Sequence, residues 1–262
     1  MEQSFDKLFC LIGNRALSFL AYLGGLTFLA AKTFKALLKE RFSGREFLDQ
    51  CEFVGNKSLN LVLLISVFTG MVLALQFAVG LGRFGLKLYI GQVIGIAIVR
   101  ELGPVLTSLM IAARVGSGFS AELGSMVVTE QVLAIEALGA NPILKLVVPR
   151  ILATTFMAPI LTTFGNIIGI LGGMVITVME AGVTPRFYFD QIRRTVSLDD
   201  YFSGITKTIF FGFLIGLISC YEGLKTEGGT AGVGRATTYA VVFSSLTVFV
   251  ADFFLTKLFI LI

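Results

Sequence analysis

The sequence predicts an all-α integral membrane protein with five transmembrane helices and an N-terminal helix that lies in the membrane interface. Of the 262 residues, 55% are hydrophobic and only 15% are charged, well below the roughly 25% charged residues of soluble domains. The mean hydropathy is +0.88, and apolar runs of about 20 residues, long enough to cross a bilayer, recur along the chain. One polytopic membrane domain follows from these observations.

The first segment, residues 1–57, differs from the rest because it is rich in lysine and arginine around one short apolar stretch, Ala16 to Ala31. This stretch is short for a membrane span, and Lys32, Lys35 and Lys39 follow it at roughly helical spacing. We therefore expect an interfacial helix on the cytoplasmic side, with a full span as the alternative.

Residues 58–262 form the predicted membrane domain. Its expected spans are Leu59–Leu81, Leu88–Ala113, Leu146–Met179, Gly204–Cys220 and Thr238–Ile262. The third is too long for a vertical crossing, so it should tilt or bend at Pro149 or Pro159.

Basic residues set the expected orientation. A cytoplasmic N-terminus places most lysines and arginines inside, whereas the other face receives Arg83, Lys87, Arg186, Arg193 and Arg194. This bias favours a cytoplasmic N-terminus. The long outer loop also carries aspartates, so it is either a docking surface or a short solvated helix.

Glycines recur at small-xxx-small spacing, which lets helices approach closely in lipid. The repeats are Gly91–Gly95, Gly165–Gly169–Gly173 and Gly212–Gly216. They predict a tightly packed bundle, formed either within one chain or between two chains.

The sequence gives little support to an enzyme. It has no histidine and only three scattered cysteines, which removes common metal and proton-transfer chemistry. Gly80–Gly85 fits GxGxxG but follows a helix instead of a strand, and Gly229–Ala236 lacks the lysine and Ser/Thr of a phosphate loop. We expect no metal, no cofactor in this chain and no nucleic acid.

Four ionisable residues interrupt the apolar spans: Arg100, Glu101, Lys207 and Asp252. A charge at the bilayer centre costs about 3 kcal/mol on insertion scales, so such residues normally face a bundle interior or a wet cavity. Lys207 and Asp252 could neutralise Glu101 and Arg100, or each other. The group is either a structural ion-pair network or part of a polar path.

The segment Gly116–Arg150 reads differently from the spans around it. Glu122, Glu130 and Glu136 sit among apolar residues, and Gly139 then supplies a helix stop. An amphipathic helix here would either contact a partner or be a plain surface helix.

Several blocks together resemble one family. They are Arg100-Glu-Leu-Gly-Pro104, Ala113-Arg-Val-Gly-Ser117, Ala121-Glu-Leu-Gly124, Thr129-Glu-Gln131, Leu146-Val-Val-Pro-Arg150, Gly234-Arg-Ala-Thr-Thr238 and Asp252-Phe-Phe-Leu-Thr256. In order and spacing, from about Gly70 to Leu258, the chain resembles the MlaE/YrbE-type permeases, the membrane subunits of ABC lipid transporters that work with MCE proteins.

This resemblance implies a homodimer in a bacterial inner membrane, with a separate cytoplasmic ATPase that binds ATP and magnesium, and a periplasmic MCE-domain protein. Phospholipid would enter a cavity between the subunits, as in the maintenance of outer-membrane lipid asymmetry. A coupling helix would lie at about residues 118–145, with Glu130, Gln131, Glu136 and Gly139 in the ATPase contact. Val127 and Leu133 stand where relatives commonly carry charges, so this contact is more apolar here.

By the resemblance, Arg100, Glu101, Lys207 and Asp252 match polar positions in the family's membrane region. Our hypothesis is that part of this network lines a cavity for a lipid headgroup, with a purely structural ion pair as the alternative. In this hypothesis the acyl chains face Leu73, Leu75 and Phe77. Two other functions stay open at this point. An ion- or proton-coupled secondary transporter would use Glu101 and Asp252 for coupling, and a scaffold would only anchor an ATPase without transporting lipid.

Overall fold

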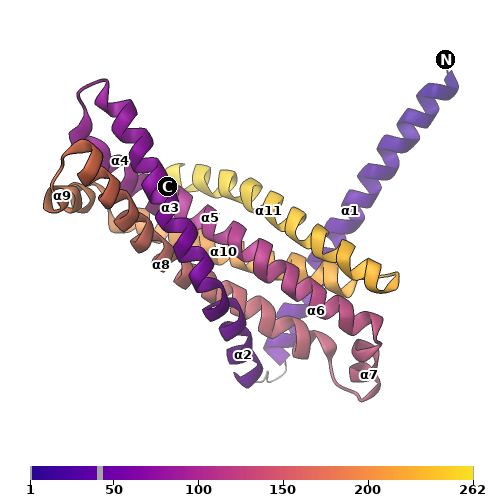
Figure 1. The fold of residues 1–262 in the computed structure, drawn as a ribbon. Coiled ribbons are helices and arrows are strands. Elements are labelled where there is room, and N and C mark those ends of the chain that lie inside the picture. Colours follow the sequence, from indigo (N-terminus) through magenta and orange to yellow (C-terminus); the bar gives the residue numbers. More distant parts are fainter. Residues whose placement is uncertain (1, 40–43, 262) are drawn as a thin grey trace.

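The computed structural model describes residues 2–39 and 44–261, and within these ranges it is helical with no strand (Figure 1). The prediction of an all-α membrane protein is confirmed. The helices are α1 (Glu2–Lys39), α2 (Gly44–Val54), α3 (Asn56–Gly82), α4 (Ile90–Ile96), α5 (Gly103–Ile111), α6 (Ser117–Val128), α7 (Gln131–Ala137), α8 (Val148–Ala181), α9 (Pro185–Thr195), α10 (Leu198–Leu224) and α11 (Gly229–Leu261).

Six helical stretches in the described part of the chain are long and apolar enough to cross a membrane: Gly13–Leu38, Gly44–Gly82, Lys87–Val128, Ile143–Ala181, Leu198–Leu224 and Gly229–Phe259. Four of them contain a predicted span, and Gly229–Phe259 covers the fifth, Thr238–Ile262, up to Phe259; residue 262 lies outside the described residues. The sixth, Gly13–Leu38, includes the stretch for which we expected an interfacial helix, and it meets the length and hydropathy of a span. Both positions of α1 are compatible with its composition.

Wide π-helical turns join several of the helices into longer rods. These turns are η2 (Ala97–Leu102), η3 (Ala112–Gly116) and η4 (Ile143–Val147), and a short 3₁₀ turn, η1 (Lys87–Tyr89), precedes α4. Such turns are often found at functional sites in helices. The Arg100-Glu101 pair lies within η2.

The rod from η1 to α6 extends well past Ala113, where the second span was predicted to end. Arg114 is accommodated because its guanidinium donates to the Phe53 carbonyl at 3.2 Å and to Ser58 Oγ at 2.9 Å. Glu122 is accommodated because it pairs with Arg150 at 2.9 Å. Charges that look like the end of a span in sequence thus have hydrogen-bond or ion-pair partners on neighbouring helices.

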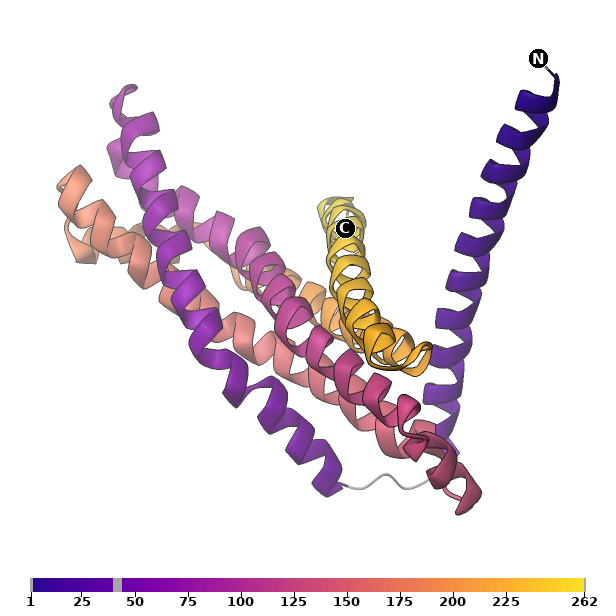
Figure 2. The same ribbon diagram turned by 45° about the vertical axis from the view of Figure 1, so that its right-hand side comes forward.

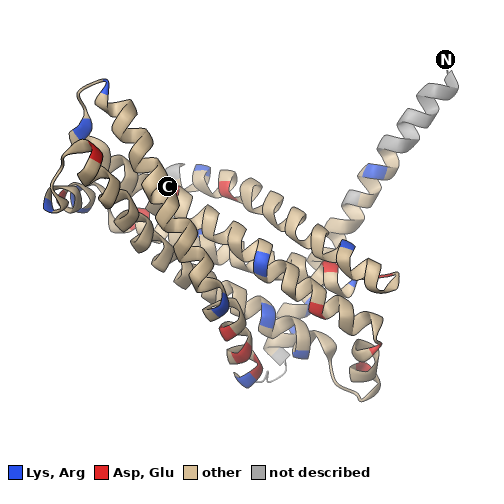
Figure 3. Cartoon of the chain, in the orientation of Figure 1, with Lys and Arg blue, Asp and Glu red and all other residues tan. Residues whose placement is uncertain are grey.

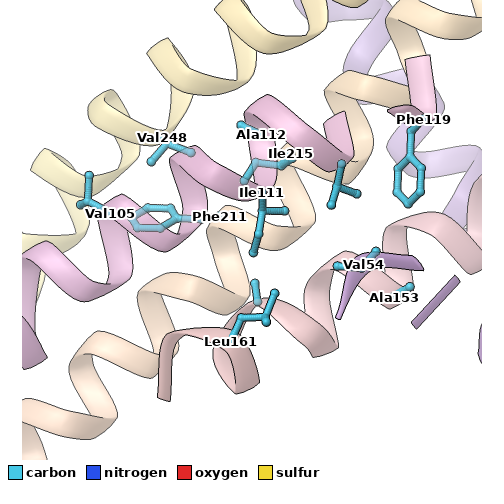
Figure 4. Close-up of a cluster of buried hydrophobic side chains, with 12 residues drawn as sticks. Val54, Val105, Ile111, Ala112, Phe119, Ala153, Leu161, Phe211, Ile215 and Val248 are labelled. Atoms are coloured by element: carbon cyan, nitrogen blue, oxygen red, sulfur yellow. The ribbon is translucent and has the colours of Figure 1, made fainter. Parts of the chain in front are cut away.

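The bundle core lies between α5, α6, α8 and α10, with one buried side chain each from α2 and α11, Val54 and Val248 (Figure 4). Its central side chains, Ile111, Phe119, Phe211 and Ile215, are fully buried. In contrast, α1 diverges from the other helices when the molecule is turned (Figure 2), and its N-terminal half stands away from the bundle, whereas α11 packs against α6 and α10.

The small-xxx-small glycines pack helices within this one chain. A Cβ on Gly169 would meet the Ser66 carbonyl at 3.3 Å, and one on Gly70 would collide with the Gly169 carbonyl. A Cβ on Gly212 would collide with Thr154 at 2.5 Å. The glycines therefore allow α3 and α10 to lie against α8, so they favour intrachain folding over dimerisation as their role.

The predicted long outer loop contains α9, which packs against α4. Tyr188 is its buried anchor, and its hydroxyl donates to the Ile170 carbonyl at 3.2 Å. Burial raises the pKa of this phenol, so it stays a donor. Thr184 and Ser197 cap the N-termini of α9 and α10. The loop is therefore a docked amphipathic helix, with Arg193 and Arg194 exposed.

Candidate functional site

A buried lysine organises the intramembrane charges. The Lys207 side chain, on α10, is completely buried, and its ammonium lies 2.6 Å from Glu101 Oε2 and 3.1 Å from Asp252 Oδ1. It also donates to Thr256 Oγ1 at 2.6 Å and to the Arg100 carbonyl at 3.4 Å. Three segments, η2, α10 and α11, therefore meet at one cation.

The structure brings together Glu101, Lys207 and Asp252, as the sequence suggested, but it separates Arg100 from them. The Arg100 guanidinium points to Asp200 at the start of α10, at 3.6 Å. The group we name the Lys207 cluster therefore consists of Glu101, Lys207, Asp252 and Thr256. With two carboxylates and one ammonium, its formal charge is negative.

The wide turn η2 explains how Glu101 reaches this cluster. Gly103 follows the turn, and a Cβ there would collide with the Asn166 side chain of α8 and meet the Ile98 carbonyl at 2.7 Å. Only glycine lets α8 approach so closely at this point. Pro104 then begins α5, where its missing N–H is tolerated. The block Arg100 to Pro104 thus shapes the backbone as well as supplying charge.

Beside the Lys207 cluster lies a cleft of about 530 Å³. Its lining residues are Glu101, Phe249, Asp252, Phe253, Thr256, Lys257 and Leu261. Glu101 retains 35% side-chain exposure and Asp252 retains 21%, whereas Lys207 retains none. The carboxylates therefore face the cleft while their cation is enclosed, and aromatic rings of α11 form the apolar wall.

The predicted acyl-chain residues lie elsewhere in the single chain. Leu73 and Phe77 are partly buried, packing α3 against α4 and α9, and Leu75 is exposed on α3. None of the three lines the cleft beside Glu101.

The predicted coupling segment, residues 118–145, is divided in the structure. Residues up to Val128 continue the membrane-length rod, with Phe119 and Leu123 fully buried against neighbouring helices. The short α7 leaves this rod but packs back onto the bundle through Val132 and Ile135. It holds Gln131 and Glu136 between Glu130 and Gly139. Glu130 has a left-handed backbone, with φ of 59°, and Gly139 has φ of 78°. Both turns lie at the exposed end of the bundle.

Sequence reasoning missed three residues that the geometry makes prominent. Thr256 contacts Lys207, Asp200 contacts Arg100, and Arg150 is 5% exposed although it carries a charge. Thr256 could have been found from its spacing, because it lies one helical turn after Asp252 and therefore on the same face of the helix. The partners of Arg100 and Arg150 depend on helix packing, which spacing does not give.

The charges otherwise gather at the two ends of the bundle, while few colour its middle (Figure 3). We name these the α7 end, which holds α2, α7 and the α10–α11 turn, and the α9 end, which holds α9 and the α3–η1 turn. The fold and the Lys207 cluster thus define a polytopic helical membrane protein with a charged cleft beside its long apolar helices.

Comparison with known proteins gives the family. The model of the permease MlaE family matches residues 47–258, and the chain belongs to this family. It is 41% identical over 231 residues to a probable ABC transporter permease of Synechocystis, covering 88% of each protein. It is 37% identical over 248 residues to a probable ABC transporter permease of Rickettsia felis, covering 95% of this chain and 96% of that one.

A plant relative also matches. The Arabidopsis protein TRIGALACTOSYLDIACYLGLYCEROL 1, chloroplastic, is 39% identical over 231 residues, which is 88% of this chain and 66% of the plant protein. The family and these relatives make the chain a permease subunit of an ABC transporter.

Proposed function

We propose that this permease moves phospholipid between the inner membrane and a periplasmic MCE-protein system, as in the maintenance of outer-membrane lipid asymmetry. The observation that carries the proposal is the cleft beside the Lys207 cluster, where charged groups and an apolar aromatic wall meet. A phospholipid has the same division, because its headgroup is polar and its chains are apolar. The carboxylates of Glu101 and Asp252 suit the cationic part of a headgroup.

The energy for transport would come from a separate ATPase that binds ATP and magnesium. The relatives named as ABC transporter permeases support this partner, since such permeases work with an ATPase. We propose that α7 contacts it through Glu130, Gln131 and Glu136, because α7 is exposed and protrudes from the α7 end (Figure 1). In this proposal the α7 end is cytoplasmic, and α1 lies in the membrane interface with the N-terminus on the same side.

We also propose that two copies of the chain enclose the lipid cavity. The cleft in one chain is open along α11, whose outward side chains Phe249, Phe253 and Phe254 are all more than half exposed. A second copy would close the open side, and Leu75 of α3 would then face the enclosed chains. An MCE-domain protein would receive or deliver lipid at the α9 end.

The plant relative supports a lipid cargo because its name contains that of a glycerolipid. The decisive experiment reconstitutes the permease with its ATPase and MCE protein in vesicles that contain a fluorescent phospholipid. We expect transfer that requires ATP and survives collapse of the proton gradient. Transfer that stops when the proton gradient collapses would identify a secondary transporter. A complex that binds the ATPase but transfers no lipid would identify a scaffold.

A further inference from the structure

A second pocket lies at the α7 end, in the turn between α10 and α11. It has a volume of about 230 Å³ and is lined by Glu222, Lys225, Thr226, Glu227, Gly232, Arg235, Ala236 and Tyr239. We name it the turn pocket. It lies at the opposite end of α11 from the Lys207 cluster and shares no lining residue with the cleft there.

The turn pocket carries two acids and two bases. Within residues 2–39 and 44–261, none of Glu222, Lys225, Glu227 and Arg235 forms an ion pair within 4.0 Å. Lys225, Glu227 and Arg235 are exposed, so solvent weakens their mutual attraction. A ligand that carries both charges would therefore find a partner for each of them in one pocket.

Glu222 is the buried acid of the turn pocket. Its residue is only 7% exposed, and its carboxylate has the Tyr22 hydroxyl of α1 as a neighbouring donor, but its Oε1 atom accepts no hydrogen bond in the described part of the chain. A buried carboxylate oxygen without a donor is costly. A donor that enters the pocket, such as an ammonium group, would satisfy it.

The backbone of the turn keeps Arg235 near the pocket. Its guanidinium lies against Gly228, where an added Cβ would come within 3.2 Å of Arg235 Nη2. Gly228 and Gly229 both have positive φ, at 86° and 68°, so the turn depends on glycine here. Arg235 is exposed and unpaired among the described residues, which leaves its donors available to an anion such as a phosphate.

An apolar stripe on α11 leads away from the pocket. Tyr239, Val242, Leu246 and Phe249 recur three or four residues apart, so they share one face with Arg235. They are 51%, 45%, 57% and 55% exposed, respectively. The stripe runs from the turn pocket to the cleft at Phe249. A tyrosine next to an arginine at the end of a span is typical of the headgroup region of a membrane.

We infer that the turn pocket binds the headgroup of a zwitterionic phospholipid in the leaflet at the α7 end. Arg235 and Lys225 would hold the phosphate, Glu222 and Glu227 would hold the ammonium, and the chains would lie along the stripe. This site goes beyond the proposed function, because it assigns lipid binding to a place outside the intramembrane cleft. It can be tested by binding alone, so its outcome is independent of whether the complex transports lipid.

The absence of tryptophan from the chain allows a local measurement. Tyr239→Trp would introduce a single fluorophore that lines the turn pocket and keeps an aromatic ring there. The purified full-length variant in detergent is titrated with short-chain phosphatidylethanolamine or phosphatidylglycerol, and the change in tryptophan emission gives the dissociation constant. Lipid bound only at the distant Lys207 cluster should leave this emission unchanged.

Two substitutions in this background separate the charges. Arg235→Gln should weaken the binding of both lipids about tenfold, because the phosphate of each loses a charged donor. Glu227→Gln should weaken the binding of phosphatidylethanolamine several-fold but leave that of phosphatidylglycerol unchanged, because phosphatidylglycerol has no ammonium group. Glu227 is exposed, so this variant should fold even where Glu222→Gln does not. Arg45→Gln, an exposed arginine of α2 outside the pocket, is the matched control and should change neither.

Soluble competitors distinguish a headgroup from a free anion. Phosphoethanolamine should displace the lipid at lower concentration than inorganic phosphate. The inference is overturned if phosphate competes equally well, if Glu227→Gln affects both lipids alike, or if Arg45→Gln weakens binding as much as Arg235→Gln. It is also overturned if neither lipid changes the emission of a folded Tyr239→Trp protein.

Discussion

The Lys207 ammonium lies 2.6 Å from the Glu101 carboxylate, joining α10 to the wide turn η2 at a point where no part of the lysine side chain is exposed. A second carboxylate, from Asp252, lies 3.1 Å from the same nitrogen. One buried cation therefore pairs with two carboxylates, so removing the cation and removing one carboxylate have different effects on stability. Loss of the cation leaves two acids unpaired, whereas loss of one acid leaves the cation with a partner.

This asymmetry predicts a large effect of Lys207→Met on folding. Glu101 and Asp252 would face each other without a cation, and breaking a buried pair typically costs about 3–5 kcal/mol. Thermal unfolding of the purified protein in detergent measures the loss. Lys87→Met, at an exposed lysine, is the control and should leave the melting temperature within a few degrees. Equal melting of the two variants would show that the Lys207 cluster does not stabilise the bundle.

Arg150 should matter more for stability than its partner Glu122. Arg150 is enclosed, donates to the Leu146 carbonyl at 2.7 Å and lies over the Phe119 ring, whereas the Glu122 side chain is 42% exposed. Arg150→Ala should therefore cost about 3 kcal/mol. Glu122→Gln keeps an oxygen acceptor for the enclosed guanidinium but removes its counter-charge, so it should cost less, about 1–2 kcal/mol. Chemical unfolding of the two variants checks the order, and a larger loss from Glu122→Gln would contradict it.

Two glycines of α3 form a matched pair for testing close helix packing. A Cβ on Gly70 would collide with the Gly169 backbone of α8, whereas one on Gly80 would meet nothing within 4 Å. Gly70→Ala should destabilise the bundle by about 1–3 kcal/mol through overpacking. Gly80→Ala should be neutral or slightly stabilising, because alanine favours a helix. Similar melting temperatures for the two variants would show that α3 and α8 are not in contact at Gly70.

Glu130 is the one non-glycine residue in the described ranges that has a positive φ, at 59°. A left-handed backbone costs an ordinary residue about 1–2 kcal/mol, and asparagine less. Glu130→Asn should therefore raise the stability slightly while it removes a charge from the proposed ATPase contact. We expect unchanged or higher melting temperature together with lower ATPase stimulation. Full stimulation would exclude a role for the Glu130 carboxylate in coupling.

The sequence predicted the fold class and the regions of the spans well, because hydropathy and helix length decide these locally. It did not predict that the helical rod continues past Ala113 to Val128, since Arg114 and Glu122 look like terminal charges unless their partners on other helices are known. The sequence did identify Glu101, Lys207 and Asp252 as candidate site residues, because a charge within an apolar span is costly to bury. It did not find Asp200 as the partner of Arg100, because that pairing depends on how α10 crosses η2.

The central proposal is that Glu101 contributes to lipid transfer and does more than neutralise Lys207. In Glu101→Gln, Asp252 remains as a partner of Lys207, so the complex should still assemble. The most direct measurement is therefore ATP-driven phospholipid transfer by this variant, reconstituted with its ATPase and MCE partners, after its melting temperature and assembly match the wild type. The proposal predicts transfer reduced at least tenfold, equivalent to about 1.4 kcal/mol. Wild-type transfer by the well-folded variant would contradict it and leave Glu101 a structural role only.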